Sequence, residues 1–223
     1  MTTITQETFL KDVENHEMTI IADTDFVRSI RFKQPNTTNR YFDITTWNGH
    51  LCISGDMGTY VFSRLPDMFT FFRNCKPNLG YWGEKLEAVS RFSGYKEFNT
   101  GLVEQSIKKR VDEICEEIEG YFDNLDKHEK EEYPTKEALE AAFREEVESH
   151  FECEDLGEYR FLAAIESFES SVITDLTLIY EGEYGWITTE KPSYQYVWVC
   201  HAIPWAIEQY DKFKSENESK DAE

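Results

Sequence analysis

The chain has 223 residues and a formal net charge of −21 at pH 7, with 40% apolar and 15% aromatic residues. This apolar content suffices for a packed core, so the composition excludes a disordered chain. A pI of about 4.6 implies repulsion from DNA, RNA and anionic membranes. We therefore expect no direct binding to nucleic acid or membrane, and a direct partner that is neutral or basic.

Cysteine usage and the N-terminal composition bear on the compartment. The cysteines are odd in number and form no CxxC pair, which favours reduced thiols over a disulfide framework; they are Cys52, Cys75, Cys115, Cys153 and Cys200. The first 17 residues are acidic and lack an apolar h-region, and no stretch approaches 18 uninterrupted apolar residues. We expect a cytoplasmic protein that is neither secreted nor membrane-spanning.

The N-terminal part of the chain predicts a short helix followed by strands. Residues 5–15 form an amphipathic pattern with Thr5 as the expected N-cap. From about residue 18 to 64 the apolar period changes to two, and an antiparallel meander of three or four strands is predicted at 26–33, 40–47, 50–54 and 59–64. Asn48-Gly49 predicts a type I′ hairpin turn, and Gly55–Gly58 supplies the next turn.

Helices are expected to follow the meander. Pro66 suits the first position of a helix that covers one face of the sheet. Residues 74–83 are predicted as a loop and 84–90 as another helical turn or two. Apolar residues then recur at helical spacing from Val103 to Leu125, which predicts one long helix over roughly 102–130.

The rest of the chain predicts two more helices, a return to strands and a last helix. Pro134 ends the long helix, and Thr135 can cap a second one. The further elements are expected as helices at 136–151 and about 158–170, strands at 172–180 and 184–189 joined by a hairpin at 181–183, and a final helix capped by Ser193. Pro204 should kink or interrupt that helix, and 215–223 should be a frayed tail.

Together these elements predict an α+β fold. The two late strands are expected to extend the first sheet, which makes residues 1–223 a single domain. Its antiparallel sheet, built from hairpins, is covered by helices, and residues 102–171 form an acidic helical insertion.

The negative charge is concentrated in that insertion. Residues 104–158 hold 20 Asp and Glu against 7 Lys and Arg, so 13 of the 21 excess charges lie there. A continuous helix over 104–130 would be about 40 Å long and would carry one acidic residue per roughly 4.5 Å, against about 3.4 Å along one DNA strand. Two such helices side by side would approach the density of duplex DNA. The predicted partner-binding residues are Asp112, Glu113, Glu116, Glu117, Glu119, Asp123, Asp126, Glu140, Glu145 and Glu148. The alternative is a solvated acidic face that only confers solubility.

No catalytic or metal-binding motif competes with this signal. The best zinc arrangement is His150 and Cys153 with Cys115 on a neighbouring helix, and it lacks a fourth ligand. The thiol and imidazole pairs Cys52 with His50, and Cys200 with His201, are expected to point apart. We expect no catalytic residue, no bound metal and no cofactor.

Aromatic residues are more numerous than one short helix can bury. Core packing explains them most simply, but some could form a seam with a second copy of the chain, so a homodimer is expected. The aromatic residues concerned are Phe69, Phe71, Phe72, Tyr81, Trp82, Trp198 and Trp205.

One segment carries a resemblance to known proteins. The block Trp47–Arg73, WNGHLCISGDMGTYVFSRLPDMFTFFR, resembles a stretch of small acidic accessory proteins of bacteriophages and prophages, and the C-terminal YVWVCHAIPWAIEQYD supports the likeness. The likeness covers less than a quarter of the chain and brings no catalytic residues with it. It implies a phage accessory protein that acts in the bacterial cytoplasm.

By analogy with other acidic phage proteins, the resemblance implies occupation of the positively charged nucleic-acid groove of a host defence complex, such as a CRISPR effector or a restriction enzyme. The leading prediction is therefore a non-enzymatic, DNA-mimic-like inhibitor that binds a basic surface of a host nucleic-acid-handling protein. Two alternatives stay open: a small enzyme or metal-dependent modifier of host machinery, and a structural phage protein whose acidity only aids solubility.

Overall fold

The computed structural model describes residues 4–90, 94–151, 158–173, 176–178, 185 and 187–221. The fold is α+β, as predicted. Two compact units divide the chain. We call Met1–Glu97 with Lys191–Glu223 the sheet unit, and Phe98–Glu190 the helical unit. A separate two-stranded pair is formed by β7 (Lys96–Phe98) and β8 (Glu190–Pro192).

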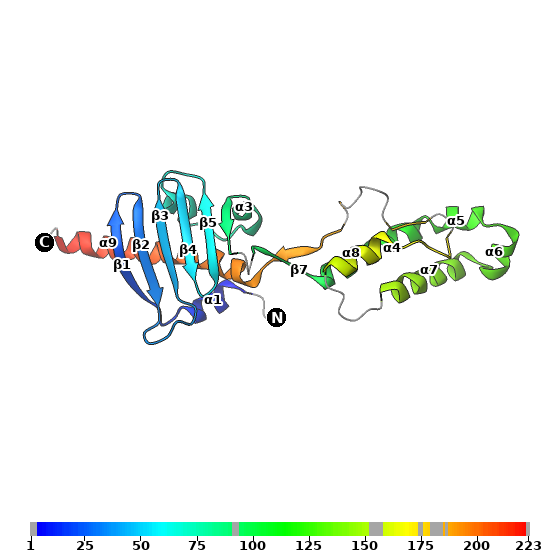
Figure 1. Cartoon of the computed structure of the whole chain (residues 1–223), viewed down its shortest axis with the longest axis horizontal. Helices are drawn as coiled ribbons and strands as arrows, with labels where there is room; N and C mark the ends of the chain where they lie inside the picture. Colours follow the sequence, from blue (N-terminus) through cyan, green and yellow to red (C-terminus); the bar gives the residue numbers. More distant parts are fainter. Residues whose placement is uncertain are drawn as a thin grey trace. The chain divides into compact units, whose positions relative to one another are not determined.

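The sheet unit is built on a six-stranded antiparallel sheet whose strands follow chain order (Figure 1). The strands are β1 (Glu17–Thr24), β2 (Val27–Lys33), β3 (Phe42–Trp47), β4 (His50–Gly55), β5 (Gly58–Ser63) and β6 (Leu86–Val89). The predicted meander is confirmed as β2 to β5. The helical turn predicted at 84–90 is wrong, because β6 pairs there with the edge of β5, with Tyr60 opposite Val89 and Phe62 opposite Leu86.

Helices cover one face of this sheet. They are α1 (Gln6–Asp12), α2 (Met68–Phe72) and α9 (Tyr194–Asp221), and Figure 1 shows α9 crossing behind the strands. Alternate residues of the strands, such as Phe32 and Phe42, are buried against them. Trp198 of α9 meets Phe42 and Phe9 edge-on, with ring centroids 5.6 and 5.1 Å apart. The core of the sheet unit therefore lies between this face and α9.

The hairpin between β3 and β4 forms where predicted, but its turn is not of type I′. That type requires a positive φ at both central residues, and at this described turn positive φ is confined to Gly49, at 78°. The Gly49 N–H donates to the Pro66 carbonyl oxygen at 3.0 Å. A tertiary contact thus takes the turn's backbone donor.

Side-chain caps fix the ends of the short helices. Thr5 caps α1 as predicted, with its hydroxyl accepting from the Thr8 N–H. The start of α2 is not Pro66, because Asp67 is the N-cap and accepts from the Phe69 N–H at 3.0 Å. Asp67 also binds the buried guanidinium of Arg28 at 2.8 and 3.3 Å. A fourth helix, α3 (Leu79–Gly83), occupies part of the predicted loop and is capped by Asn78.

The last helix is longer than predicted. Ser193 caps it, accepting from the Tyr196 N–H at 3.3 Å, but α9 continues through Pro204 without interruption. A proline inside a helix costs roughly 3 kcal/mol, and the apolar residues buried on both sides of it, among them Ile203 and Ile207, offset that cost. The frayed tail predicted from 215 is wrong as far as Asp221, because the Lys, Glu and Ser residues there continue the helix.

The helical unit replaces the single predicted helix over 102–130 with three. These three are α4 (Thr100–Glu116), α5 (Ile118–Asn124) and α6 (Lys127–Glu132). The unit also contains α7 (Lys136–Phe151) and α8 (Glu158–Glu166). The first break falls at Glu117. The second falls at Asp126, whose carboxylate accepts from the His128 and Glu129 N–H groups at 2.7 and 2.9 Å. A capping box there supplies the backbone with partners that a continuous helix would not need.

The strands predicted at 172–180 do not extend the sheet. Ile173, Leu176 and Leu178 are instead buried in the core of the helical unit, with Phe143 of α7, and the described residues there form one isolated bridge, between Glu169 and Thr177. Their alternating apolar pattern is satisfied by helices in place of neighbouring strands. The hairpin predicted at 181–183 lies outside the described residues.

Candidate functional site

Negative charge is divided very unequally between the two units. The helical unit contains 26 Asp and Glu against 8 Lys and Arg, a net of −18, whereas the sheet unit contains 18 against 15, a net of −3. The helical unit is thus the part of the chain that can attract a basic partner most strongly. The helical unit is therefore the candidate site.

Two acidic segments of this unit run side by side in opposite directions. Arg144 of α7 pairs with Asp112 of α4 at 2.8 Å. Further along, Lys136 at the start of α7 pairs with Glu119 of α5, also at 2.8 Å. Residue numbers rise along α4 and α5 as they fall along α7, so the two segments are antiparallel neighbours.

Half of the ten predicted partner-binding residues are engaged within the unit. Asp112 and Glu140 are half-buried and share Arg144, at 2.8 and 2.9 Å. Glu119 binds Lys136 as above. The other two also have local contacts: Glu113 lies 3.5 Å from both Lys109 and Arg110, and Asp126 caps α6. Asp112 and Glu119 thus connect neighbouring helices, whereas the contacts of Glu113, Glu140 and Asp126 are local.

The other half faces solvent. Each of these residues is exposed, and none makes an ion pair with a residue that the structure describes; they are Glu116, Glu117, Asp123, Glu145 and Glu148. They are the carboxylates available to a partner without loss of an internal contact. The sequence does not distinguish the engaged carboxylates from the exposed ones, because both sets recur along the polar faces of the same helices.

The charge density of the surface is modest. The stretch from α4 through α5 (100–124), with Glu117 between the two helices, and α7 together carry 12 carboxylates and 5 basic residues, a net of −7. Over the length of about 37 Å spanned by α4 and α5, this is one net charge per roughly 5 Å, sparser than the about 3.4 Å of a single DNA strand. The surface can attract a basic groove, but it does not reproduce the spacing of phosphates.

A shallow pocket of about 530 Å³ lies between α4, α7 and α8. Val111, Val147 and Phe161 contribute apolar surface, and charged side chains of Lys108 and Glu148 also line it. The sequence held no signal for this pocket, because it depends on how the three helices pack.

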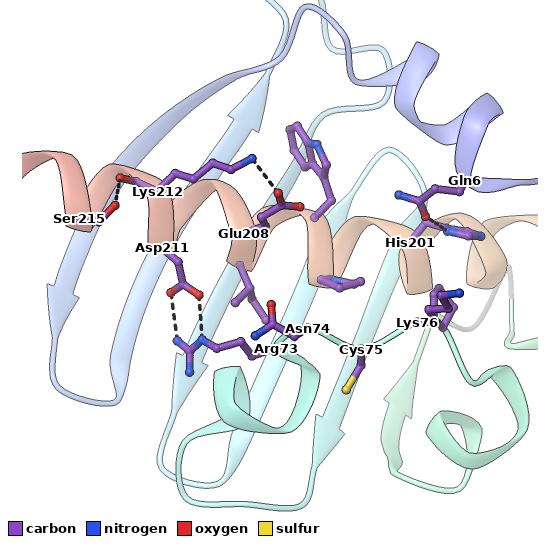
Figure 2. A pocket seen from close by; sticks show the side chains of 14 residues that line it. Gln6, Arg73, Asn74, Cys75, Lys76, His201, Glu208, Asp211, Lys212 and Ser215 are labelled. Carbon is purple, nitrogen blue, oxygen red and sulfur yellow. Dashed lines mark hydrogen bonds and ion pairs between the residues drawn. The ribbon is translucent and has the colours of Figure 1, made fainter.

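A second pocket, of about 800 Å³, lies in the sheet unit between α9 and the loop after α2 (Figure 2). His201 lies 2.8 Å from the Gln6 side-chain oxygen, measured from its Nδ1, and burial lowers the pKa of this imidazole. Cys75 lines the same pocket and is exposed. Figure 2 shows its sulfur directed away from His201, so the two do not form a nucleophile and base pair.

The thiol pairs considered from the sequence are not activated. Cys52 and His50 stand two residues apart on β4 and share its outward face, so the expectation that they point apart is wrong. Burial nevertheless raises the pKa of Cys52, and the His50 ring stacks on Trp47 at 5.1 Å. Burial also raises the pKa of Cys200, to about 12. A raised pKa leaves little thiolate at neutral pH.

The zinc arrangement considered from the sequence falls partly outside the described residues, because Cys153 is not among them. The Nε2 atom of His150 lies 3.0 Å from the Ala164 carbonyl oxygen. Across the described ranges, no three His, Cys, Asp or Glu side chains are placed to hold a metal ion.

The surplus aromatic residues lie mostly in the core. Phe69, Phe72, Trp82 and Trp198 are all buried, and only Tyr81 of the set is as much as 40% exposed. These residues therefore provide no exposed aromatic surface for the expected dimer seam.

Among the helices that the structure describes, none has the length and apolar composition to cross a membrane. Comparisons of the chain with protein-family models, with curated proteins and with solved structures found no match.

Proposed function

We propose that the helical unit binds a basic surface of a nucleic-acid-handling protein, as a non-enzymatic, phage-encoded inhibitor of a host defence complex in the bacterial cytoplasm. The observation that carries this proposal is the segregation of charge: −18 in the helical unit against −3 in the sheet unit. The class of target, a CRISPR effector or a restriction enzyme, comes from the resemblance of Trp47–Arg73 to phage accessory proteins.

Electrostatics favours such a role through the rate of encounter. A strongly anionic unit raises the association rate with a cationic groove, and this steering weakens as salt screens it. The net charge density is below that of a DNA strand, so we expect long-range attraction to speed binding and close contacts to select the partner. The inhibitor would compete with nucleic acid by occupying the groove.

The test compares two charge-reversed variants of equal charge. The first carries Glu116→Lys, Glu117→Lys and Glu145→Lys, which leave every ion pair described in the helical unit intact. The control reverses three exposed acids of the sheet unit, Glu14, Glu17 and Glu87, to Lys. Both gain six positive units, so a difference between them reports position and not net charge.

Each protein is immobilised and exposed to a bacterial lysate at about 50 mM and about 500 mM salt. Captured nucleic-acid-binding proteins are identified and purified. Wild type and each of the two variants are then added separately to their complexes with DNA or RNA. We expect wild type and control to capture the same protein at low salt and to displace its nucleic acid, and the helical-unit variant to lose both activities. Equal capture and displacement by both variants would show that the acidic face serves only solubility.

A further inference from the structure

The sheet presents one face that α1, α2 and α9 of its own unit do not cover. Along β2 to β5, the side chains that alternate with the buried ones all retain some exposure, while α9 packs on the opposite face (Figure 1). We call this surface the open sheet face. Its central row runs across four strands through Ser29, Thr45, Cys52 and Val61, which are successive partners in the register. These side chains are small, so the middle of the face is flat.

Apolar and aromatic groups gather at one end of the open sheet face. Trp47 is 39% exposed and Val27 is 49% exposed. The Trp47 ring lies parallel to that of its register partner His50, with an interplanar angle of 7°. Large side chains that remain in water on a regular strand are a feature of surfaces that bind other proteins.

The open sheet face is electrically balanced in a protein of net charge −21. Arg31 and Asp43 form two parallel hydrogen bonds with each other, each of 2.8 Å. Beside them, Lys33 stands opposite Glu17 in the register. A basic partner would be drawn to the helical unit, whereas a balanced face is attracted to neither sign and accepts a surface like itself without repulsion.

The size of the face suits a weak dimer. Six strands about 4.8 Å apart, each about 20 Å long, cover roughly 500 Å². Two such faces in contact would bury about 1,000 Å², which is near the lower limit for a specific interface. An area at this limit is typical of a weak or transient interface and not of a permanent dimer.

We propose that two copies of the chain associate through their open sheet faces, around a two-fold axis that lies between the sheets. In such an isologous contact each residue near the axis approaches its own copy. Thr45 and Cys52 occupy the middle of the two central strands, β3 and β4. Cys52 of one copy then lies across from Cys52 of the other, with the sheets about 10 Å apart. The inference does not depend on the target of the helical unit.

Sedimentation over a range of concentrations, from about one to several hundred micromolar, tests the dimer. We compare wild type with Thr45→Lys, which brings like charges together at the axis. The control is Leu10→Lys, at a residue of α1 that is 43% exposed on the helical layer. We expect wild type and Leu10→Lys to dimerise alike and Thr45→Lys to dimerise at least about tenfold more weakly. A wild type that stays monomeric throughout, or equal behaviour of the two variants, would overturn the proposal.

Cross-linking locates the interface independently of a substitution on it. In a Cys75→Ser, Cys153→Ser background, Cys52 is the one described cysteine that is not buried. A bis-maleimide that spans about 10 Å should join two chains through Cys52, and adding Cys52→Ser should abolish the product. A mono-maleimide at about pH 8.5 serves as the control for the reactivity of Cys52. A dimer by sedimentation in which Cys52 takes up the mono-maleimide but gives no cross-link would place the contact elsewhere and would also overturn the proposal.

Discussion

His201 shows how one side chain links packing to pH. It projects from α9 into the sheet-unit pocket, stacks on Phe9 at 5.9 Å and contacts Gln6 of α1. Charged groups that line the same pocket are Arg73 at the end of α2, Lys76 from the loop, and Glu208, Asp211 and Lys212 from α9. Burial lowers the pKa of His201 from its ordinary 6.5. The folded protein therefore favours the neutral imidazole.

Because the pKa of His201 is lowered in the folded protein, the free energy of unfolding depends on pH. As pH falls through 6.5, the unfolded chain takes up a proton at this site before the folded protein does, so stability falls with pH and levels off below the lowered pKa. We expect the unfolding free energy of wild type, measured with urea, to fall between pH 8 and pH 5.5 relative to that of His201→Gln, which keeps a neutral side chain at every pH. If plots of unfolding free energy against pH ran parallel for the two proteins, they would contradict a lowered pKa of His201.

At the level of single residues, the sequence predicted a side chain's hydrogen-bond partner only where that partner is near in the chain. Thr5 was identified as a cap because its hydroxyl reaches the Thr8 N–H within one turn. Asp67 was missed because its second partner, Arg28, lies 39 residues away in the chain. The division of the acidic residues into paired and unpaired sets was missed for the same reason, since Arg144 joins Asp112 only after α4 and α7 pack.

At the level of elements, two hairpin glycines share a positive φ but differ in the space around the position of a Cβ atom. Gly49 has a φ of 78° and open space where a Cβ would stand. Gly55 has a φ of 155°, and an added Cβ would collide with the Tyr41 carbonyl oxygen and lie 2.8 Å from the Phe42 Cα. Phe42 belongs to β3, whose backbone cannot move aside without breaking its register with β4.

We therefore expect Gly49→Ala to cost about 1 kcal/mol of unfolding free energy, the strain of a positive φ alone. Gly55→Ala should cost about 3 kcal/mol or more, because overpacking adds to strain. Urea denaturation of both variants measures the difference. Equal costs would mean that the β3–β4 pair yields to the added methyl group.

The strands were predictable and the long helix was not, for a physical reason. In the meander, alternation and turn residues agree, and each strand pairs with the next along the chain. Over 102–130 the apolar spacing continues through Ile118 and Phe122 although the helix breaks twice. Periodicity detects a buried face but does not detect a cap such as Asp126 within a polar run. Strand-like alternation at 172–178 predicted a strand, but its described members Ile173, Leu176 and Leu178 are buried in the core of the helical unit.

At the level of the whole molecule, the two units differ most in charge. A compact body of net −18 repels itself, and unfolding relieves that repulsion by moving the charges apart. The sheet unit, at −3, has little to relieve. The same asymmetry that favours binding of a basic partner thus lowers the stability of the unit that would bind it, and a partner should restore that stability by neutralising it.

This asymmetry predicts different salt dependence for the two units within one chain. Four tryptophans lie in the sheet unit, at positions 47, 82, 198 and 205, so a Trp186→Phe variant makes tryptophan fluorescence report that unit alone, while circular dichroism also follows the helical unit. Raising the salt from about 10 mM to about 500 mM shortens the screening length from about 30 Å to a few Å. We expect the transition seen by circular dichroism to rise by several degrees, about 5 °C for each kcal/mol of repulsion removed, and the fluorescence transition to move little. The sheet unit is the internal control for general effects of salt, so equal shifts in both signals would mean that self-repulsion does not limit the stability of the helical unit.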